Sequence, residues 1–298
     1  MDSAKDKYTG KIIDGEELWL INQVDKERYI CRGCGVLVNP VSFEKGLKTR
    51  PHFKKLLKYP HEIWCDIEGE ERLIKTAKRK SIKNENGFPC SFPHKLELID
   101  SKKKLSNEGG FEKTTNSKPL SNGKKETLSS SRSISKWVAR TIRPICRTYN
   151  NFPKDRDLPL SITGLFGDIY NDTIRKLSSQ EIVKYTKKHL FYAPISWKHP
   201  TIDGKNYIFE LSYGYWTKNG LTPYKIIIDT SDWSQAKTAY ILEELEVARN
   251  EAIQANKKDN KTRTKSWLFF IGEQSVDSPD TFTVNDHRLI CCLTLDSI

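Results

Sequence analysis

The sequence has no long apolar run, and this absence excludes a membrane-spanning protein of the helical type. Nowhere do its 298 residues approach the roughly 18 consecutive apolar residues that a transmembrane helix needs. The first residues, MDSAKDKYTGKIIDGEELW, also lack the apolar stretch of a secretory signal. We therefore expect a cytoplasmic protein without a membrane partner, in which the seven cysteines stay reduced and serve as metal ligands or buried thiols.

The common catalytic signatures are missing as well. The chain has no glycine-rich phosphate loop, no Ser/His/Asp set, no His-Glu-x-x-His and no internal repeat. Only one Cys-x2-Cys pair is present, whereas two such pairs would mark a zinc ribbon clearly. These absences leave an enzymatic activity as an alternative, and they favour a binding function for the protein.

Acidic residues are scarce in one half of the chain. Residues 1–156 contain 33 Lys and Arg against 20 Asp and Glu, a balance of +13, while residues 157–298 contain 17 against 18, a balance of −1. The whole net charge of +12 thus comes from the N-terminal half. A basic excess confined to one half favours a polyanion partner, above all a nucleic acid. A solvated, lysine-rich surface is the plainer alternative.

Composition divides the chain into three parts. Residues 1–100 hold a group of cysteines and histidines, and residues 134–298 have a sustained apolar pattern. Residues 101–133 between them are rich in Ser and Lys and contain no Val or Ile, which is typical of a flexible linker because such a segment buries too little apolar surface to fold. We therefore predict the α+β class, with a small zinc-stabilised N-terminal module, a flexible linker and a C-terminal domain of mixed sheet and helices.

The C-terminal part alternates helical and strand patterns. We expect helices over residues 134–151, 167–189 and 234–257, and strands over 190–197, 265–273 and 280–296. The turn Asn219-Gly220 predicts a hairpin between two further strands. In the third helix, one apolar stripe follows helical spacing and consists of Ile241, Leu245, Ala248 and Ala252.

The resulting order of elements has a possible αβββαβ core, which resembles that of restriction-endonuclease-like nucleases. Those enzymes hold a divalent ion with an Asp and a Glu-x-Lys on adjacent strands. Asp203 and Glu210 occupy suitable places, but the lysine is missing, with Lys225 as its stand-in. A metal-dependent nuclease is therefore one alternative function, and a DNA-tethered subunit that contacts a protein partner through its C-terminal domain is another.

The candidate metal ligands lie in YICRGCGVLVNP and the stretch after it, with the spacing Cys31-x2-Cys34-x17-His52-x8-His61-x3-Cys65. Zinc takes four nitrogen or sulfur ligands in a tetrahedron, and the glycines beside Cys34 permit a tight turn. We choose Cys31, Cys34, His52 and Cys65 as the zinc ligands, with His61 as the substitute. Four protein ligands leave no position for water, so the site is expected to be structural.

The other cysteines are weaker candidates for metal ligands. Cys90 and His94 form a pair that is an alternative source of ligands in place of Cys65. Cys291 and Cys292 are adjacent on a predicted strand, so their side chains face opposite ways. We interpret these two and Cys146 as packing residues.

The segment CRGCGVLV…RPHFKK…WCDIEG resembles the N-terminal zinc-ribbon-like segment of competence protein CoiA-like proteins, over roughly residues 28–66. The resemblance implies metal-ligand roles for Cys31, Cys34, His52 and Cys65. It also implies bacterial DNA processing and, in some members, an appended restriction-type nuclease domain. Lys55 departs from the pattern, because the family often has a second histidine there, and Ser91-Phe-Pro-His94 matches a displaced Ser-x-x-His.

A row of cations on the predicted helix 134–151 contains no acidic residue. Its members fall at positions i, i+4, i+8, i+11 and i+15, and they are Arg132, Lys136, Arg140, Arg143 and Arg147. Such a row repels itself unless an anion lies along it, and guanidinium groups suit phosphate. Pro144 should kink this helix or start a second one.

Two further cationic groups lie nearer to the metal ligands. One surrounds them and comprises Lys45, Lys48, Arg50, Lys54, Lys55 and Lys58, and the other has helical spacing and comprises Arg72, Lys75, Arg79 and Lys83. We take the row on the predicted helix, together with Lys54 and Lys55, as the candidate nucleic-acid-binding residues. Contacts of this kind position a phosphate backbone, of DNA in our interpretation, and do not read its sequence.

Overall fold

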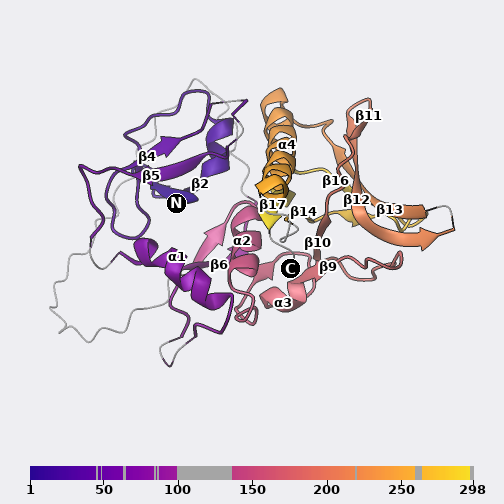
Figure 1. The fold of residues 1–298 in the computed structure, drawn as a ribbon, viewed down its shortest axis with the longest axis horizontal. Helices are drawn as coiled ribbons and strands as arrows, with labels where there is room; N and C mark the ends of the chain where they lie inside the picture. Colours follow the sequence, from indigo (N-terminus) through magenta and orange to yellow (C-terminus); the bar gives the residue numbers. More distant parts are fainter. Residues whose placement is uncertain are drawn as a thin grey trace, which may run out of the picture.

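A computed structural model of the chain describes residues 1–44, 46–47, 49–62, 65–83, 85, 87–98, 136–218, 220–258 and 264–295 (Figure 1). The expected linker 101–133, and with it Arg132, lies outside the described residues, as do Lys45 and Lys48. The rest of the chain mixes helices with several small sheets, so the α+β class is confirmed.

Short strands build the N-terminal region around a small core. A sheet of order β2-β1-β3 comprises β2 (Ile12–Asp14), β1 (Ser3–Asp6) and β3 (Tyr29–Ile30), and the 3-10 helix η1 (Gly15–Leu20) follows β2. A second pair joins β4 (Val38–Val41) to β5 (His52–Lys55) in antiparallel register. The core between these sheets is formed by Ala4, Leu18, Tyr29, Cys31, Val38, Phe53 and Cys65.

The next elements join the two halves of the chain. After helix α1 (Asp66–Ala77), strand β6 (Phe92–Leu96) pairs in parallel with β7 (Lys136–Ala139) and β8 (Ser161–Ile162). One apolar core runs beneath this sheet, with Phe88 and Phe92 from before residue 100 and Ile145 and Phe269 from after residue 134. The described parts of residues 1–100 and 134–298 therefore share a core.

The C-terminal half contains two larger sheets. One has the order β17-β14-β10-β9 and the other the order β11-β12-β13-β16-β15. The strands of the first are β9 (Ile174–Lys176), β10 (Leu190–Pro194), β14 (Lys265–Phe270) and β17 (Ile290–Leu295). Those of the second are β11 (Thr201–Asp203), β12 (Asn206–Thr217), β13 (Gly220–Asp229), β15 (Glu273–Gln274) and β16 (Thr281–Val284).

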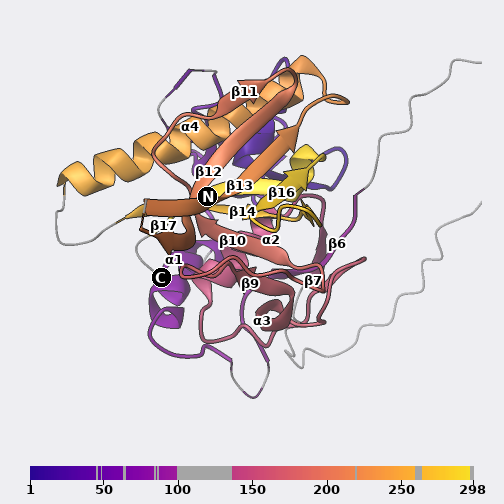
Figure 2. The same ribbon diagram turned by 90° about the vertical axis from the view of Figure 1, so that its right-hand side faces the viewer.

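The helices of this half are α2 (Arg143–Asn151), the short α3 (Tyr170–Thr173) and the long α4 (Gln235–Lys258), and a 3-10 turn, η2 (His287–Leu289), precedes β17. Helix α4 packs against β14 and β17 and lies along one side of the molecule in Figure 2. Its predicted apolar stripe is buried throughout, since Ile241, Leu245, Ala248 and Ala252 are at most 2% exposed. The sequence pattern thus located this helix and its inner face.

Most of the expected C-terminal elements are confirmed, namely the helix at 234–257, the strand at 190–197, the hairpin of β12 and β13, and the strands at both later segments. The expected helix 134–151 is wrong in its first half, because Trp137 and Val138 pair with β6 as strand β7. Helix α2 begins only at Arg143, with Pro144 in its first turn, where a missing N–H costs nothing.

The expected helix 167–189 is also wrong. Only Tyr170–Thr173 are helical, and the chain then enters strand β9. Just after β9, the hydroxyl oxygen of Ser178 accepts hydrogen bonds from the backbone N–H groups of Gln180 and Glu181. Such a side-chain turn competes with helix formation. The apolar periodicity that suggested a helix here reflects residues that reach the core from irregular structure.

Candidate metal centre

Three cysteines and one histidine converge at the edge of the N-terminal core. They are Cys31, Cys34, His61 and Cys65, and their ligand atoms all lie within 4.8 Å of one another. The Sγ atoms of Cys31 and Cys65 are 3.6 Å apart, and Nδ1 of His61 lies 3.2 Å from Cys34 Sγ and 3.4 Å from Cys65 Sγ. Ligands about 2.3 Å from a tetrahedral zinc ion are separated by about 3.8 Å, so this donor set has the size of a zinc site.

The first two ligands come from a tight turn between β3 and β4. The N–H of Gly35 donates to the carbonyl oxygen of Cys31 (2.9 Å), and the N–H of Cys31 donates to that of Val36 (2.7 Å). Gly35 has a φ of +76°, the left-handed conformation that glycine adopts without a steric penalty. The N–H of Gly33 also points at Cys31 Sγ (3.4 Å), as expected of a turn that holds a thiolate.

The other two ligands lie at the start of α1. Cys65 is the N-cap residue of this helix, and its N–H donates to the carbonyl oxygen of Glu62 (2.9 Å). His61 precedes it by four residues, and its imidazole contacts the Cys65 thiol. A metal ion held here would therefore connect the turn after β3 directly to the first residue of α1.

The surroundings favour the thiolate form that a metal requires. Burial raises the pKa of Cys34, but the N–H groups of Val36 and Glu62 and the neighbouring thiols outweigh burial and lower this pKa to about 6. Cys31 and Cys65 are 1% and 5% exposed, whereas Cys34 and His61 are half-buried. Buried thiols with a preformed set of donors are the chemistry of a structural zinc site.

The structure corrects one member of the expected ligand set. His52 is not part of the cluster, because its Nδ1 donates to the carbonyl oxygen of Arg50 (3.0 Å). Successive side chains of a strand point to opposite faces, and on β5 it is Phe53 that enters the core. His52 therefore faces away from the thiols, and His61, the substitute in the sequence-based choice, takes its place.

The remaining cysteines lie elsewhere. His94 donates from Nδ1 to the carbonyl oxygen of Trp137 (3.0 Å), so the alternative pair with Cys90 does not join the cluster. Cys90, Cys146, Cys291 and Cys292 are at most 7% exposed. This burial agrees with the interpretation of the last three as packing residues.

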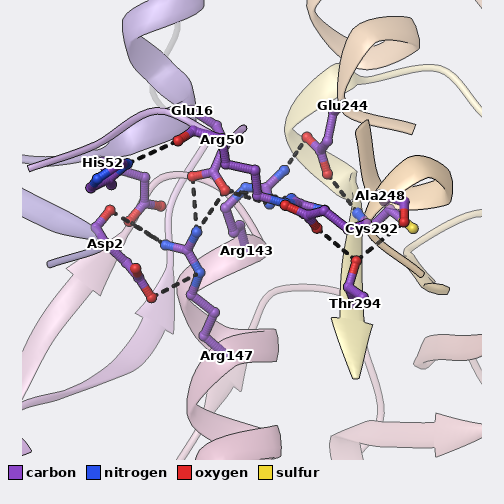
Figure 3. A network of polar contacts seen from close by, with 12 residues as sticks. Asp2, Glu16, Arg50, His52, Arg143, Arg147, Glu244, Ala248, Cys292 and Thr294 are labelled. Atoms are coloured by element: carbon purple, nitrogen blue, oxygen red, sulfur yellow. Dashed lines mark hydrogen bonds and ion pairs between the residues drawn. The ribbon is translucent and has the colours of Figure 1, made fainter. Parts of the chain in front are cut away.

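The expected cationic row does not form a free face, because two of its arginines are buried in a network of charges (Figure 3). The guanidinium of Arg143, 2% exposed, contacts Glu16 (3.2 Å) and Glu244, which are 0% and 1% exposed. Arg147 contacts Glu16 (2.7 Å) from the next turn of α2. Both arginines are thus paired with the protein's own carboxylates and do not present the expected free cationic face.

Arg50 extends this network from the N-terminal region to α4. Its Nε donates to both carboxylate oxygens of Glu251 (3.1 and 3.0 Å), and its Nη1 lies 3.5 Å from Glu16. Burial raises the pKa of Glu16, but the three guanidinium groups around it outweigh burial and hold this pKa at about 2. The network therefore ties η1 and the segment before β5 to α2 and α4 by ion pairs.

The other members of the row lie at the surface without sharing a helix face. Lys136 is exposed at the start of β7, and Arg140 is half-buried in the turn after it. Lys54 and Lys55 are exposed on β5. Sequence periodicity placed these residues on one line only because it assumed a helix where β7 forms.

The acidic residues considered for a nuclease are not brought together. Asp203 lies opposite Asn206, four residues before Glu210 on β12, a separation of about 13 Å along a strand. Glu210 pairs with Lys198 (2.8 Å), and Lys225 lies across from it on β13. Within the described ranges, the Cys/His cluster is the group of metal-ligating side chains that the fold assembles.

No helix in the described part of the chain has both the length and the apolar character that crossing a membrane requires. Comparison with known proteins adds no identification: no protein-family model, no curated protein and no solved structure matches this chain.

Proposed function

We propose that this protein is a zinc-containing nucleic-acid-binding protein, with Cys31, Cys34, His61 and Cys65 holding a structural Zn²⁺ ion. Three thiolates and one imidazole fill a tetrahedron and leave no position for a reacting water. The reducing cytoplasm that we expect as its compartment would keep these thiols available. The ion would then act on the fold, by fixing the elements that carry its ligands.

The observation that carries this proposal is the position of Cys65, which is both a cluster member and the N-cap of α1. A metal ion at the cluster would fix where α1 begins and hence where its side chains lie. The last turn of α1 and the residues after it present exposed cations, namely Arg72, Lys75, Lys78, Arg79 and Lys80. Within the side chains that the structure describes, none of these five forms an ion pair with an acidic residue.

We therefore place the phosphate contacts on α1 and the residues just after it, with Arg72 and Lys75 on the helix and Arg79 beyond its end. Lys83, the fourth member of the helically spaced group, is paired with Asp157. Exposed Lys54 on β5 adds a cation on the same N-terminal region. The contacts are sequence-independent in this proposal, because lysines and arginines that meet phosphates position a backbone without reading bases.

The resemblance of residues 28–66 to CoiA-like proteins supports DNA over RNA as the partner. The C-terminal half has a charge balance of −1, which suits contacts with another protein better than contacts with a polyanion. We propose this half as the surface for a protein partner of the DNA-bound chain.

Removing the cations of α1 should weaken DNA binding. In the variant Arg72→Gln/Lys75→Gln/Arg79→Gln, we expect at least about a tenfold loss of affinity and a salt slope shallower by roughly 2–3, because a complex with three fewer phosphate contacts releases fewer counterions. Fluorescence anisotropy with a labelled duplex at several salt concentrations measures both quantities. Zinc content and melting temperature should stay at the wild-type values.

A matched control removes three exposed lysines of the C-terminal half, Lys184→Gln/Lys205→Gln/Lys218→Gln. This variant has the same change of net charge, and its affinity should fall by less than about threefold. Equal losses in both triple variants would show that only net charge matters and would contradict the assignment to α1.

A further inference from the structure

A cleft opens between α1, α2 and the end of β17. Its volume is about 710 Å³, and its lining includes Lys78 after α1, Asn150 and Asn151 at the end of α2, Arg156 beyond it, and Leu295 of β17. Arg50, Arg147, Asp2 and Glu251 also line it. The volume lies in the range of roughly 300–1,000 Å³ that is typical of binding pockets.

The charges in this cleft do not balance. Among its described lining residues, four are cations and two are acidic, and Glu251 is already paired with Arg50 and accepts a hydrogen bond from Thr294 (2.7 Å). Arg147 is likewise paired, with Glu16. The uncompensated positive charge therefore comes from Lys78 and Arg156.

The guanidinium of Arg156 is held in place by contacts that use only part of its hydrogen-bond donors. Its Nε donates to the carbonyl oxygen of Tyr149 (3.2 Å), and the group lies 3.7 Å from the centre of the Tyr149 ring. These two contacts fix the plane of the guanidinium and leave its two terminal nitrogens without a partner among the described atoms. A guanidinium held in this way is preorganised to donate two parallel hydrogen bonds to a phosphate.

Arg50, another lining residue of the cleft, has one donor atom without a partner among the described atoms. The Nη2 atom of Arg50 is buried, and no described atom accepts a hydrogen bond from it. A buried donor without a partner is rare in folded proteins, because desolvation without a hydrogen bond is costly. The amides of Asn150 and Asn151 add uncharged donors on the same wall.

We propose that this cleft seats phosphate groups of a single nucleic-acid strand that continues from the cationic end of α1. The inference rests on the proposed function, and it adds the location and the strandedness of the contact. Lys78 belongs to both the α1 surface and the cleft, so the path is continuous. The cleft is recessed between α1, α2 and the end of β17, so we expect a flexible single strand to enter it and a rigid duplex to contact the exposed cations at the end of α1.

The test compares labelled single-stranded and duplex oligonucleotides on the full-length, zinc-loaded protein. For Lys78→Gln/Arg156→Gln, single-strand affinity should fall at least about tenfold, and the salt slope should become shallower by about 1.4, which corresponds to two phosphate contacts. Duplex affinity should fall less than about threefold. The control Arg175→Gln removes an exposed arginine that also lies over a tyrosine ring, that of Tyr185, and should change neither affinity.

The possible outcomes separate the two proposals. Suppose that the wild type binds DNA and that the α1 triple variant binds it more weakly, while Lys78→Gln/Arg156→Gln binds it as tightly as the wild type. The proposed role of the cleft is then wrong, and the proposed function stands. Equal losses for single strand and duplex overturn the strand selectivity. If the wild type binds neither the single-stranded nor the duplex oligonucleotide, both proposals are wrong. Because Arg156 also contacts Tyr149, Lys78→Gln alone, at an exposed position, guards against a loss caused by misfolding.

Discussion

Replacing Cys65 by serine is expected to abolish zinc binding and to unfold the N-terminal region. The substitution removes one thiolate from a four-ligand set, at the residue that precedes α1. Structural zinc contributes on the order of 10 kcal/mol to the folding of small domains, a figure comparable with the whole stability of most proteins. We expect the melting temperature, followed by circular dichroism, to fall by roughly 10 °C or more.

Cys90→Ser is the matched control for this experiment. Cys90 is also buried, at 7% exposure, but it lies outside the cluster. A chelator should lower the melting temperatures of the wild type and of Cys90→Ser, and it should leave that of Cys65→Ser unchanged. A chelator effect of the same size in Cys65→Ser would mean that the metal is held elsewhere.

The second large effect is expected at the buried charge network. In Arg143→Met, Glu244, which is 1% exposed, loses its guanidinium partner and remains as an uncompensated charge, while Glu16 keeps only Arg147 and Arg50. Breaking a buried pair from one side typically costs about 3–5 kcal/mol. Urea denaturation of the purified variant should show a loss of that size in the free energy of unfolding.

An exposed pair serves as the control for this prediction. Lys188 contacts Glu273 (2.6 Å) at the surface, and Lys188→Met should change the free energy of unfolding by less than about 1 kcal/mol. The double variant Arg143→Met/Glu244→Gln should recover part of the loss, because Glu244 then no longer carries an unpaired buried charge and Glu16 keeps its contact with Arg147. A loss below about 1 kcal/mol in Arg143→Met would mean that these groups are solvated and not buried.

The pH dependence of stability gives the same network a second readout. The folded-state pKa of Glu16, about 2, lies below its ordinary value of 4.5. Its contribution is therefore complete above pH 4.5 and is lost as the pH falls towards 2. In Arg143→Met the folded-state pKa should rise, because one of the three guanidinium groups is gone, and the contribution of Glu16 should shrink or change sign.

Local chemistry made half of the metal site predictable. Cys-x2-Cys with an adjacent glycine specifies its own turn, and Gly35 adopts the positive φ that the turn requires. The choice between His52 and His61 depended on which face of β5 enters the core, and that is decided by packing against residues distant in the sequence, such as Ala4 and Tyr29. The spacing of the ligands does not indicate which face of β5 points into the core. The four-residue separation of His61 and Cys65 was nevertheless a usable signal in favour of His61 as a ligand.

The cationic row shows a different limit of prediction from sequence. A row of like charges does need an anion beside it, and that physical argument was sound. The anions are the protein's own carboxylates, Glu16 on η1 and Glu244 on α4, each about 100 or more residues away from α2 in sequence. Only the tertiary fold brings them together, and a sequence pattern cannot distinguish an internal counter-ion from an external phosphate.

Zinc content per chain in the wild type, His61→Ala and His52→Ala tests the central claim most directly. Mass spectrometry under native conditions should give about one zinc ion for the wild type and for His52→Ala, and a much lower occupancy for His61→Ala, because only His61 faces the three thiols. A wild-type protein without zinc, or a loss of zinc in His52→Ala with retention in His61→Ala, would contradict the site described above.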